Sequence, residues 1–142
     1  MERLLIEATE QTPYVCLDKE TTTFEISGRS IPKDAEAFYD VILNWLDEYK
    51  ASPATQTKFT FDLDCFNIST SKRILFILYK LNEIFEANHD VTVRWVYSAG
   101  DDDMLEVGQD FAYMVKVPFE FCQVGKKVKT PHGKANDFTL AS

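Results

Sequence analysis

Basic residues, histidine and cysteine are scarce in this chain of 142 residues. It has 15 lysines and arginines against 23 aspartates and glutamates, which gives a net charge of −8, with two histidines and three cysteines. Nucleic acids and anionic membrane surfaces are bound mainly through lysine and arginine, so this charge argues against both. The odd cysteine count and the lack of a CxxC spacing argue against a disulfide framework. We expect no nucleic-acid partner, and we expect Cys16, Cys65 and Cys122 to be small buried side chains.

Long apolar segments are also missing. The longest aliphatic and aromatic run, residues 74–79, is far shorter than the roughly 20 residues that a membrane-spanning helix needs. Met1 leads directly into Glu2 and Arg3, without the pattern of a secretory signal peptide. We therefore expect a cytoplasmic protein without membrane insertion.

The common catalytic motifs are absent as well. The sequence has no GxSxG elbow, no P-loop and no GxGxxG stretch. His89 falls at a predicted helix end and His132 in a polar tail, where exposed side chains are usual. A catalytic Cys–His pair is an alternative, but no feature of the sequence supports it. We expect no cofactor and no enzymatic activity.

The composition is that of one globular domain. Hydrophobic residues make up 45% and charged residues 27% of the chain, as in ordinary soluble domains. A chain of this length buries enough surface to fold without a disulfide or a metal. From Gly125 on, Lys126, Lys127, Lys129 and Lys134 are mixed with glycine, proline and asparagine. We predict a single domain over residues 1–125 and a mobile tail over residues 126–142.

The spacing of apolar residues predicts the order of the elements. A short extended segment at residues 3–8 is followed by a strand at 14–17 and a second at 22–27, which form a hairpin. Helices are predicted up to about residues 49, 88 and 117, with strands at 58–65, 91–97 and 119–124 between and after them. The first helix should bury one apolar face, formed by Phe38, Val41, Ile42, Trp45, Leu46 and Tyr49. This order predicts an α/β fold with a mixed, mostly parallel sheet, three main helices packed on it and an N-terminal β-hairpin.

One short hinge, residues 67–72, joins a strand to the start of a helix. It contains three hydroxyl side chains, namely Ser69, Thr70 and Ser71. Free N–H groups and the positive end of the helix dipole point outward there, which suits a capping residue and also a phosphate. A phosphate there could interact with the cationic side chains of Lys72 and Arg73, and it would add a charge of about −1.5 to −2. The sequence of the hinge is therefore compatible both with a structural role in helix capping and with a regulatory phosphorylation site.

Acidic residues gather at a second strand end. The members of this cluster are Asp101, Asp102, Asp103, Glu106 and Asp110. Acidic residues at this position can stabilise the start of a helix through its dipole. Alternatively, they could bind a hard cation, because such cations prefer oxygen ligands. Asp62 and Asp64 are predicted to lie on one face of a strand. They could act as a catalytic carboxylate pair, or they could simply face the solvent. A small metal-dependent enzyme using an acidic site therefore remains an alternative function.

Several separated stretches resemble, in order, the SiaC-type regulatory phosphoproteins. These proteins are related in shape to STAS-domain anti-sigma factor antagonists. The similar stretches are residues 28–32, 61–72, 101–111 and 116–121, together with Trp95 and the helix containing Phe38, Trp45 and Leu46. The resemblance covers roughly residues 8–124 and implies a STAS-like single domain.

The resemblance implies a non-catalytic bacterial signalling switch. In this family a Ser/Thr kinase phosphorylates a hydroxyl in the hinge, and a PP2C-type phosphatase removes the phosphate. The unphosphorylated form binds and activates a diguanylate cyclase, which raises cyclic di-GMP and connects the protein to biofilm control. The expected partners are therefore proteins. The oligomeric state is left open.

The hinge departs from the family pattern at one position. The family commonly has Asn-Thr-Ser-Ser, and the hydroxyl directly after the asparagine is modified. Here that position is Ile68, so the analogy with STAS domains favours Ser69, with Thr70 next. The remaining hinge residues are expected to face a phosphate or a partner: Asn67, Ile68, Ser71 and Lys72. Asp101, Asp102, Asp103 and Glu106 form a candidate partner surface.

The absence of a hydroxyl at Ile68 also favours an alternative. In this second hypothesis the protein is a constitutive interaction or scaffold domain of the same fold, without a phosphorylation switch.

Overall fold

The computed structural model describes residues 1–129 and 135–139, with side chains up to Lys126. Its helices are α1 (Ala35–Tyr49), α2 (Ile68–Glu86) and α3 (Asp102–Met114). Its strands are β1 (Leu4–Ile6), β2 (Tyr14–Asp18), β3 (Thr23–Ser30), β4 (Gln56–Phe66), β5 (Asp90–Ser98), β6 (Phe119–Val124), β7 (Lys127–Lys129) and β8 (Ala135–Thr139).

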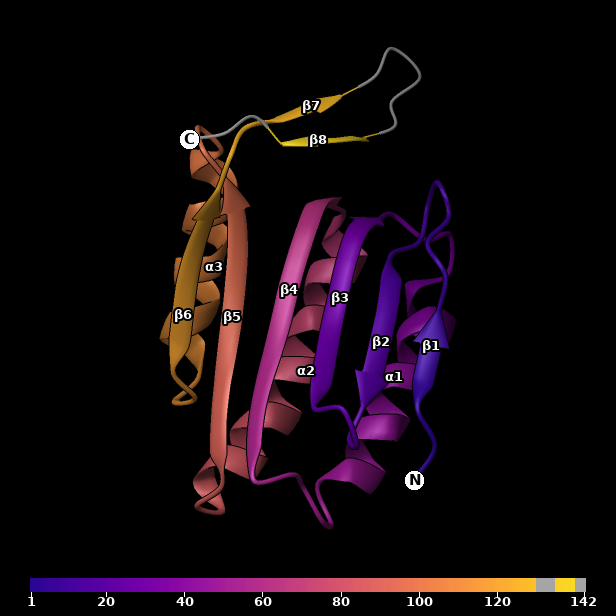
Figure 1. Cartoon of the computed structure of the whole chain (residues 1–142), viewed down its shortest axis with the longest axis vertical. Helices are drawn as coiled ribbons and strands as arrows, with labels where there is room; N and C mark the ends of the chain where they lie inside the picture. Colours follow the sequence, from indigo (N-terminus) through magenta and orange to yellow (C-terminus); the bar gives the residue numbers. More distant parts are fainter. Residues whose placement is uncertain (130–134, 140–142) are drawn as a thin grey trace.

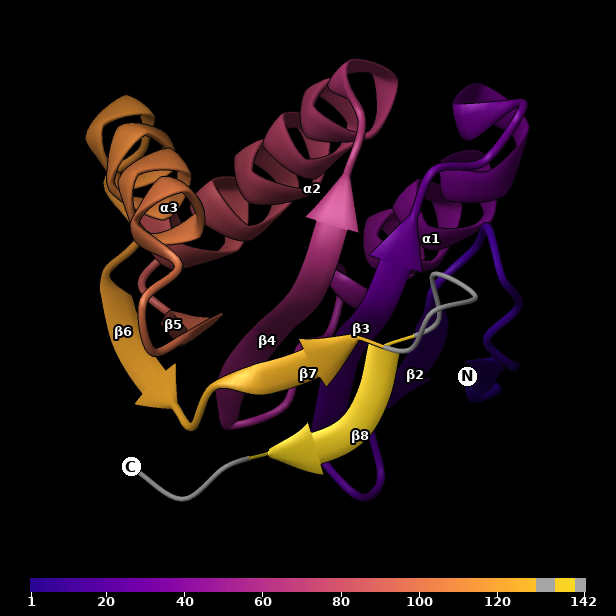
Figure 2. The same ribbon diagram turned by 90° about the horizontal axis from the view of Figure 1, so that it is seen from above.

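Six strands form one mixed sheet in the order β1-β2-β3-β4-β5-β6 (Figure 1). Strands β1, β2 and β3 pair in antiparallel fashion, which confirms the N-terminal hairpin. The pairs β3–β4, β4–β5 and β5–β6 are parallel. All three helices cover the same face of this sheet (Figure 2). The predicted α/β fold with a mostly parallel sheet and three helices is confirmed.

Trp95 on β5 lies at the centre of the core beneath α3. Its ring centre is 5.6–6.5 Å from those of four neighbours, Phe61, Phe66, Phe111 and Phe119. Its indole Nε1 donates a hydrogen bond of 2.9 Å to the carbonyl of Met104 at the start of α3. A Cβ at Gly108 would lie 2.5 Å from the indole, so this glycine allows α3 to approach the sheet closely.

The buried face of α1 differs from the predicted one: Ala35 is also buried, Phe38 is only half-buried, and two further positions are exchanged. Val41 is 47% exposed, whereas Tyr39 is fully buried. The apolar pattern missed Tyr39 because the polar end of a tyrosine must find a partner inside the protein, and here its hydroxyl lies 2.6 Å from Ser30 Oγ. The three cysteines are free and only partly buried, so the prediction of buried side chains was wrong.

The segment predicted as a mobile tail contains β7 and β8, which pair in antiparallel fashion. Residues 130–134 and 140–142 lie outside the described part of the chain. The domain boundary at residue 125 and the mobility of the tail stay predictions. No helix in the described ranges is long and apolar enough to cross a bilayer.

Candidate functional site: the strand-to-helix hinge

The hinge lies at the edge of the sheet where the parallel strands end (upper edge in Figure 1). It follows β4 directly, and the turn after β5 leads into α3 at the same edge. The backbone N–H of Asn67 donates to the carbonyl of Ser30 at the end of β3, at 3.2 Å. In open sheets of this kind, functional loops gather beyond the carboxyl ends of the strands. The structure therefore places the predicted hinge where such a site is expected.

Asn67 is the N-cap of α2. Its backbone is extended, and its Oδ1 accepts a hydrogen bond of 2.9 Å from the N–H of Thr70. The same oxygen accepts a second bond of 3.0 Å from the hydroxyl of Ser69. An asparagine at this position satisfies one of the N–H groups that a helix start leaves free. The cap is thus supplied by Asn67, and the hydroxyl residues that follow form the first turn.

Thr70 points into the protein and is fully buried. Its hydroxyl donates a 3.0 Å hydrogen bond to the carbonyl of Ser30 and lies 2.9 Å from Ser30 Oγ. Tyr39 completes this buried group of hydroxyls from α1, and burial raises the pKa of Tyr39 to about 12. A phosphoryl group on Thr70 would have to occupy space that these side chains fill. The structure therefore argues against Thr70 as a phosphorylation site in the folded protein.

Ser69 points outward and is exposed. Beside it, the Ile68 side chain is 89% exposed. Ser71 is half-buried, and its hydroxyl donates a 2.8 Å bond to the carbonyl of Ile68. Of the three hinge hydroxyl residues, Ser69 is exposed, Ser71 is half-buried and Thr70 is fully buried.

Two cations lie one helical turn after Ser69. The ammonium of Lys72 lies 5.8 Å from the ring centre of Phe76, and Lys72 is exposed. The guanidinium of Arg73 lies 5.4 Å from the same ring and forms a 3.1 Å ion pair with Glu36 of α1. Side chains three and four residues apart on a helix are neighbours. A negative group on Ser69 would therefore have cationic neighbours.

The acidic cluster after β5 serves the start of α3. Asp101 is the N-cap and accepts a 3.1 Å bond from the N–H of Met104. Asp102, Asp103 and Glu106 are exposed on the first turns of the helix, where negative charge interacts favourably with the dipole. No group of three metal-ligating side chains is brought together within residues 1–129 and 135–139. The alternative of a metal site at this cluster gains no support.

Sequence reasoning missed the buried partners of the hinge. Ser30 and Tyr39 hold Thr70 in place, but they come from β3 and α1, far from residue 70 along the chain. The predicted strand ended at residue 27, whereas β3 continues to Ser30 and brings this serine to the hinge. Nothing in its local pattern indicated that it contacts the hinge.

Comparison with known proteins decides the family. The sequence model of the SiaC family regulatory phosphoproteins matches residues 6–124. This chain belongs to the SiaC family. A relative described as an uncharacterized protein, PA14_02130 of Pseudomonas aeruginosa (strain UCBPP-PA14), is 24% identical over 119 residues, which span 84% of this chain and 94% of the relative.

Solved structures of the family show the same fold. SiaC of Pseudomonas aeruginosa superposes with a TM-score of 0.80 at 23% identity, covering 87% of this chain and 99% of that one. A second match, with a TM-score of 0.78 and 23% identity, comes from the crystal structure of the diguanylate cyclase SiaD in complex with its activator SiaC. It covers 84% of this chain and 98% of that one. The family match ends at residue 124, so the segment from Gly125 onward lies beyond it.

Proposed function

We propose that this member of the SiaC family is a non-catalytic cytoplasmic switch whose partner is a diguanylate cyclase. In this proposal, phosphorylation of Ser69 controls binding to the cyclase. A Ser/Thr kinase adds the phosphate, and a PP2C-type phosphatase removes it. The observation that carries the proposal is the exposed Ser69 hydroxyl at the start of α2, beside the exposed Ile68. The solved complex of SiaD with its activator SiaC supports the choice of partner.

A phosphate on Ser69 is compatible with the fold. Ser69 is the second residue of α2, where negative charge is stabilised by the helix dipole, typically by about 0.3–1 kcal/mol. The bond between Asn67 Oδ1 and the N–H of Thr70 does not involve the Ser69 side chain, so the cap would survive. Lys72 and Arg73 would partly offset the added charge.

The same phosphate would change what a partner meets at the hinge. Ile68 is an exposed apolar side chain, and its full burial by a partner would contribute roughly 1.5–3 kcal/mol to the binding free energy. A phosphate carrying about −1.5 to −2 charges on the neighbouring residue must be desolvated when a partner covers Ile68. Phosphorylation is therefore expected to weaken binding while the fold is kept, which is what a binding switch requires.

The test compares three proteins in binding to the diguanylate cyclase of the source organism. Ser69→Asp adds a charge, and Ser69→Asn is the neutral control of the same size. Calorimetric titration is expected to give at least a tenfold weaker affinity for Ser69→Asp, with Ser69→Asn close to wild type. Cyclase activity, measured as cyclic di-GMP formed, should fall in the same order. Equal affinities for all three proteins would contradict the switch.

A constitutive scaffold of the same fold is the second candidate, and the isoleucine at position 68 favours it. Mass spectrometry of the intact protein from its native host separates the two hypotheses. The switch predicts a species heavier by about 80 Da, the mass of one phosphoryl group, that maps to Ser69. Its persistent absence under conditions that change cyclic di-GMP levels would support the scaffold instead.

A further inference from the structure

Arg73 connects the first turns of α1 and α2. Its guanidinium lies 3.1 Å from the carboxylate of Glu36, which belongs to the first turn of α1. The side chain of Arg73 is 16% exposed, whereas that of Glu36 is 70% exposed. Both helices begin at the edge of the sheet that carries the hinge, so this ion pair lies close to Ser69 (Figure 1).

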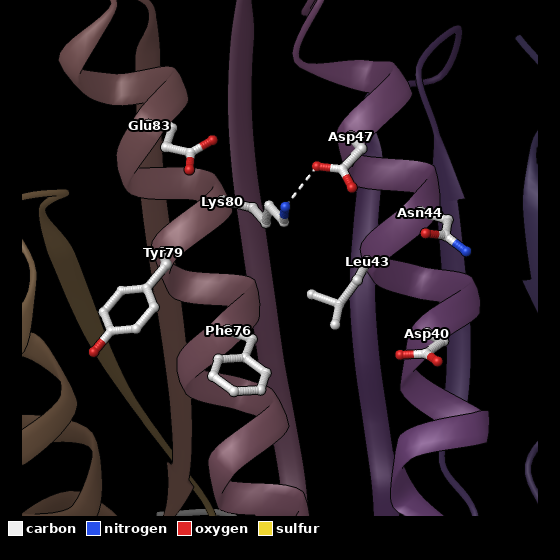
Figure 3. Close-up of a pocket in the computed structure, with 8 residues that line it drawn as sticks. All are labelled: Asp40, Leu43, Asn44, Asp47, Phe76, Tyr79, Lys80 and Glu83. Atoms are coloured by element: carbon white, nitrogen blue, oxygen red, sulfur yellow. Dashed lines mark ion pairs between the residues drawn. The ribbon is translucent and has the colours of Figure 1, made fainter.

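Two further ion pairs connect the same helices away from the hinge. Lys80 of α2 lies 2.6 Å from Asp47 of α1 (Figure 3). Lys50, the C-cap of α1, lies 3.0 Å from Glu83 of α2. Both pairs belong to the far end of α1. At the hinge end, the ion pair that the structure describes between these helices is the one formed by Arg73.

Ser69 and Arg73 are neighbours on the surface of α2. They are four residues apart, so their side chains lie on the same face of the helix, one turn from each other. Side chains of a helix lean toward its N-terminus, and the side chain of Arg73 therefore leans toward Ser69. An anion on Ser69 would meet a guanidinium that is already paired with Glu36.

A phosphate on Ser69 would be the stronger partner for Arg73. It carries about −1.5 to −2 charges and three acceptor oxygens, against a single charge on a carboxylate, and it suits bidentate binding by a guanidinium. It would also lie on the same helix as Arg73, whereas Glu36 belongs to another helix and is mostly exposed, where an ion pair contributes little. A guanidinium shared by both would hold two anions close together, and their repulsion disfavours that arrangement.

We propose that phosphorylation of Ser69 transfers Arg73 from Glu36 to the phosphate. The Glu36 carboxylate is then released into the solvent at the start of α1, and the ion pair between the two helices at the hinge end is lost. This inference rests on the proposed function, because it assigns a structural consequence to phosphorylation of the same residue.

The exchange extends the effect of one phosphate to a second helix. A paired carboxylate at the start of α1 becomes an unpaired one, while α2 carries the phosphate. The buried hydroxyls of Ser30, Tyr39 and Thr70 still hold the two helix starts against β3, so the surface changes and the fold is kept. A partner that approaches the hinge therefore meets added negative charge on both helices.

The test measures how strongly Glu36 and the phosphate on Ser69 depend on each other. Phosphoserine is incorporated at position 69 during expression, and urea denaturation gives the unfolding equilibrium constant with and without it. Glu36→Gln is expected to raise this constant more in the unmodified protein than in the phosphorylated protein. The difference should be about two- to fivefold, the range of one exposed ion pair, because Arg73 has already left Glu36 in the phosphorylated protein.

Two controls separate the exchange from direct repulsion between the phosphate and Glu36, which would give a difference of the same sign. In an Arg73→Gln background the difference should disappear, because no guanidinium is left to change partners. Asp40→Asn removes another exposed carboxylate of α1, one turn farther along, and should act equally in both forms. A difference that survives in Arg73→Gln, or no difference in either background, would overturn the proposal.

Binding to the diguanylate cyclase distinguishes failure of this inference from failure of the proposed function. If Glu36→Gln acts equally in both forms but the phosphate still weakens cyclase binding, the exchange is wrong and the proposed function stands. If the difference depends on Arg73 as expected but the phosphate leaves cyclase binding unchanged, the exchange stands and the proposed function is wrong.

Discussion

The hydroxyl oxygens of Ser30 and Tyr39 lie 2.6 Å apart directly beneath the hinge, and both residues are fully buried. Together with Thr70 they form a closed hydrogen-bonded group that joins β3, α1 and the first turn of α2. Buried polar groups are stable only when they are satisfied, so each member depends on the others. Neighbouring hydroxyls of one hinge thus have opposite roles: Thr70 anchors the helix and Ser69 faces the solvent.

A charge at Thr70 is expected to destabilise the protein strongly, whereas a charge at Ser69 is not. Thr70→Asp places a carboxylate in a fully buried site without a cation, which costs about 3–5 kcal/mol or more of unfolding free energy. Thr70→Val keeps the shape but leaves the Ser30 hydroxyl and carbonyl short of a partner, at a cost of about 1–3 kcal/mol.

Urea denaturation of these variants measures the difference. Ser69→Asp should stay within about 0.5 kcal/mol of wild type, as is usual for an exposed position. Thr70→Ser, which keeps the hydroxyl, is the conservative control. If Thr70→Asp proved as stable as Ser69→Asp, the hydroxyl of Thr70 would be open to solvent and would return as a phosphorylation candidate.

Tyr39 should make the protein less stable in strongly alkaline solution. Burial raises the pKa of Tyr39 in the folded protein to about 12, above the ordinary tyrosine pKa of 10.0, so the unfolded chain loses the proton first as the pH rises. The stabilising contribution is complete below pH 10, falls between about pH 10 and 12, and is lost once the folded pKa is passed. The slope in this window is about −1.4 kcal/mol per pH unit.

Tyr39→Phe removes the titrating group and keeps the ring. Urea titrations at pH 9, about 10.5 and about 11.5 should show that wild type loses more stability than Tyr39→Phe over this range, by a difference that grows with pH. Identical pH dependence in the two proteins would mean that the Tyr39 hydroxyl is not buried as described.

Removing the cap of α2 should destabilise the helix start and expose the role of Asn67. Asn67→Ala loses the bonds from the N–H of Thr70 and the hydroxyl of Ser69, at a cost of about 0.5–2 kcal/mol. Asn67→Asp keeps an acceptor and adds a charge that suits the dipole, so it should be as stable as wild type.

The measurement is again chemical denaturation, combined with hydrogen exchange of residues 68–71. Faster exchange in Asn67→Ala with normal exchange in α1 and α3 would locate the effect at the cap. Asn67→Ala at wild-type stability, with unchanged exchange, would show that the helix start does not depend on this side chain.

The order of elements could be predicted from the sequence because it depends on local patterns. Alternation in residues 58–65 followed by helical spacing after residue 72 marks β4, the hinge and α2, and each signal lies within one short stretch. The alternation of helices with strands then restricted the fold to a mostly parallel sheet with helices packed on it. The hinge was identified for the same reason: a strand end and a helix start both leave signals within a few residues.

Tertiary structure alone decided which hinge hydroxyl is buried and which is exposed. Ser69 and Thr70 are adjacent and chemically similar, and only the packing of Ser30 and Tyr39 against Thr70 separates them. The groove between α1 and α2, which is lined by Leu43 and Phe76 among others, likewise exists only because these two helices lie side by side on the sheet (Figure 3). The two helices are remote in sequence. Burial depends on contacts between distant segments, and no local pattern of residues records those contacts.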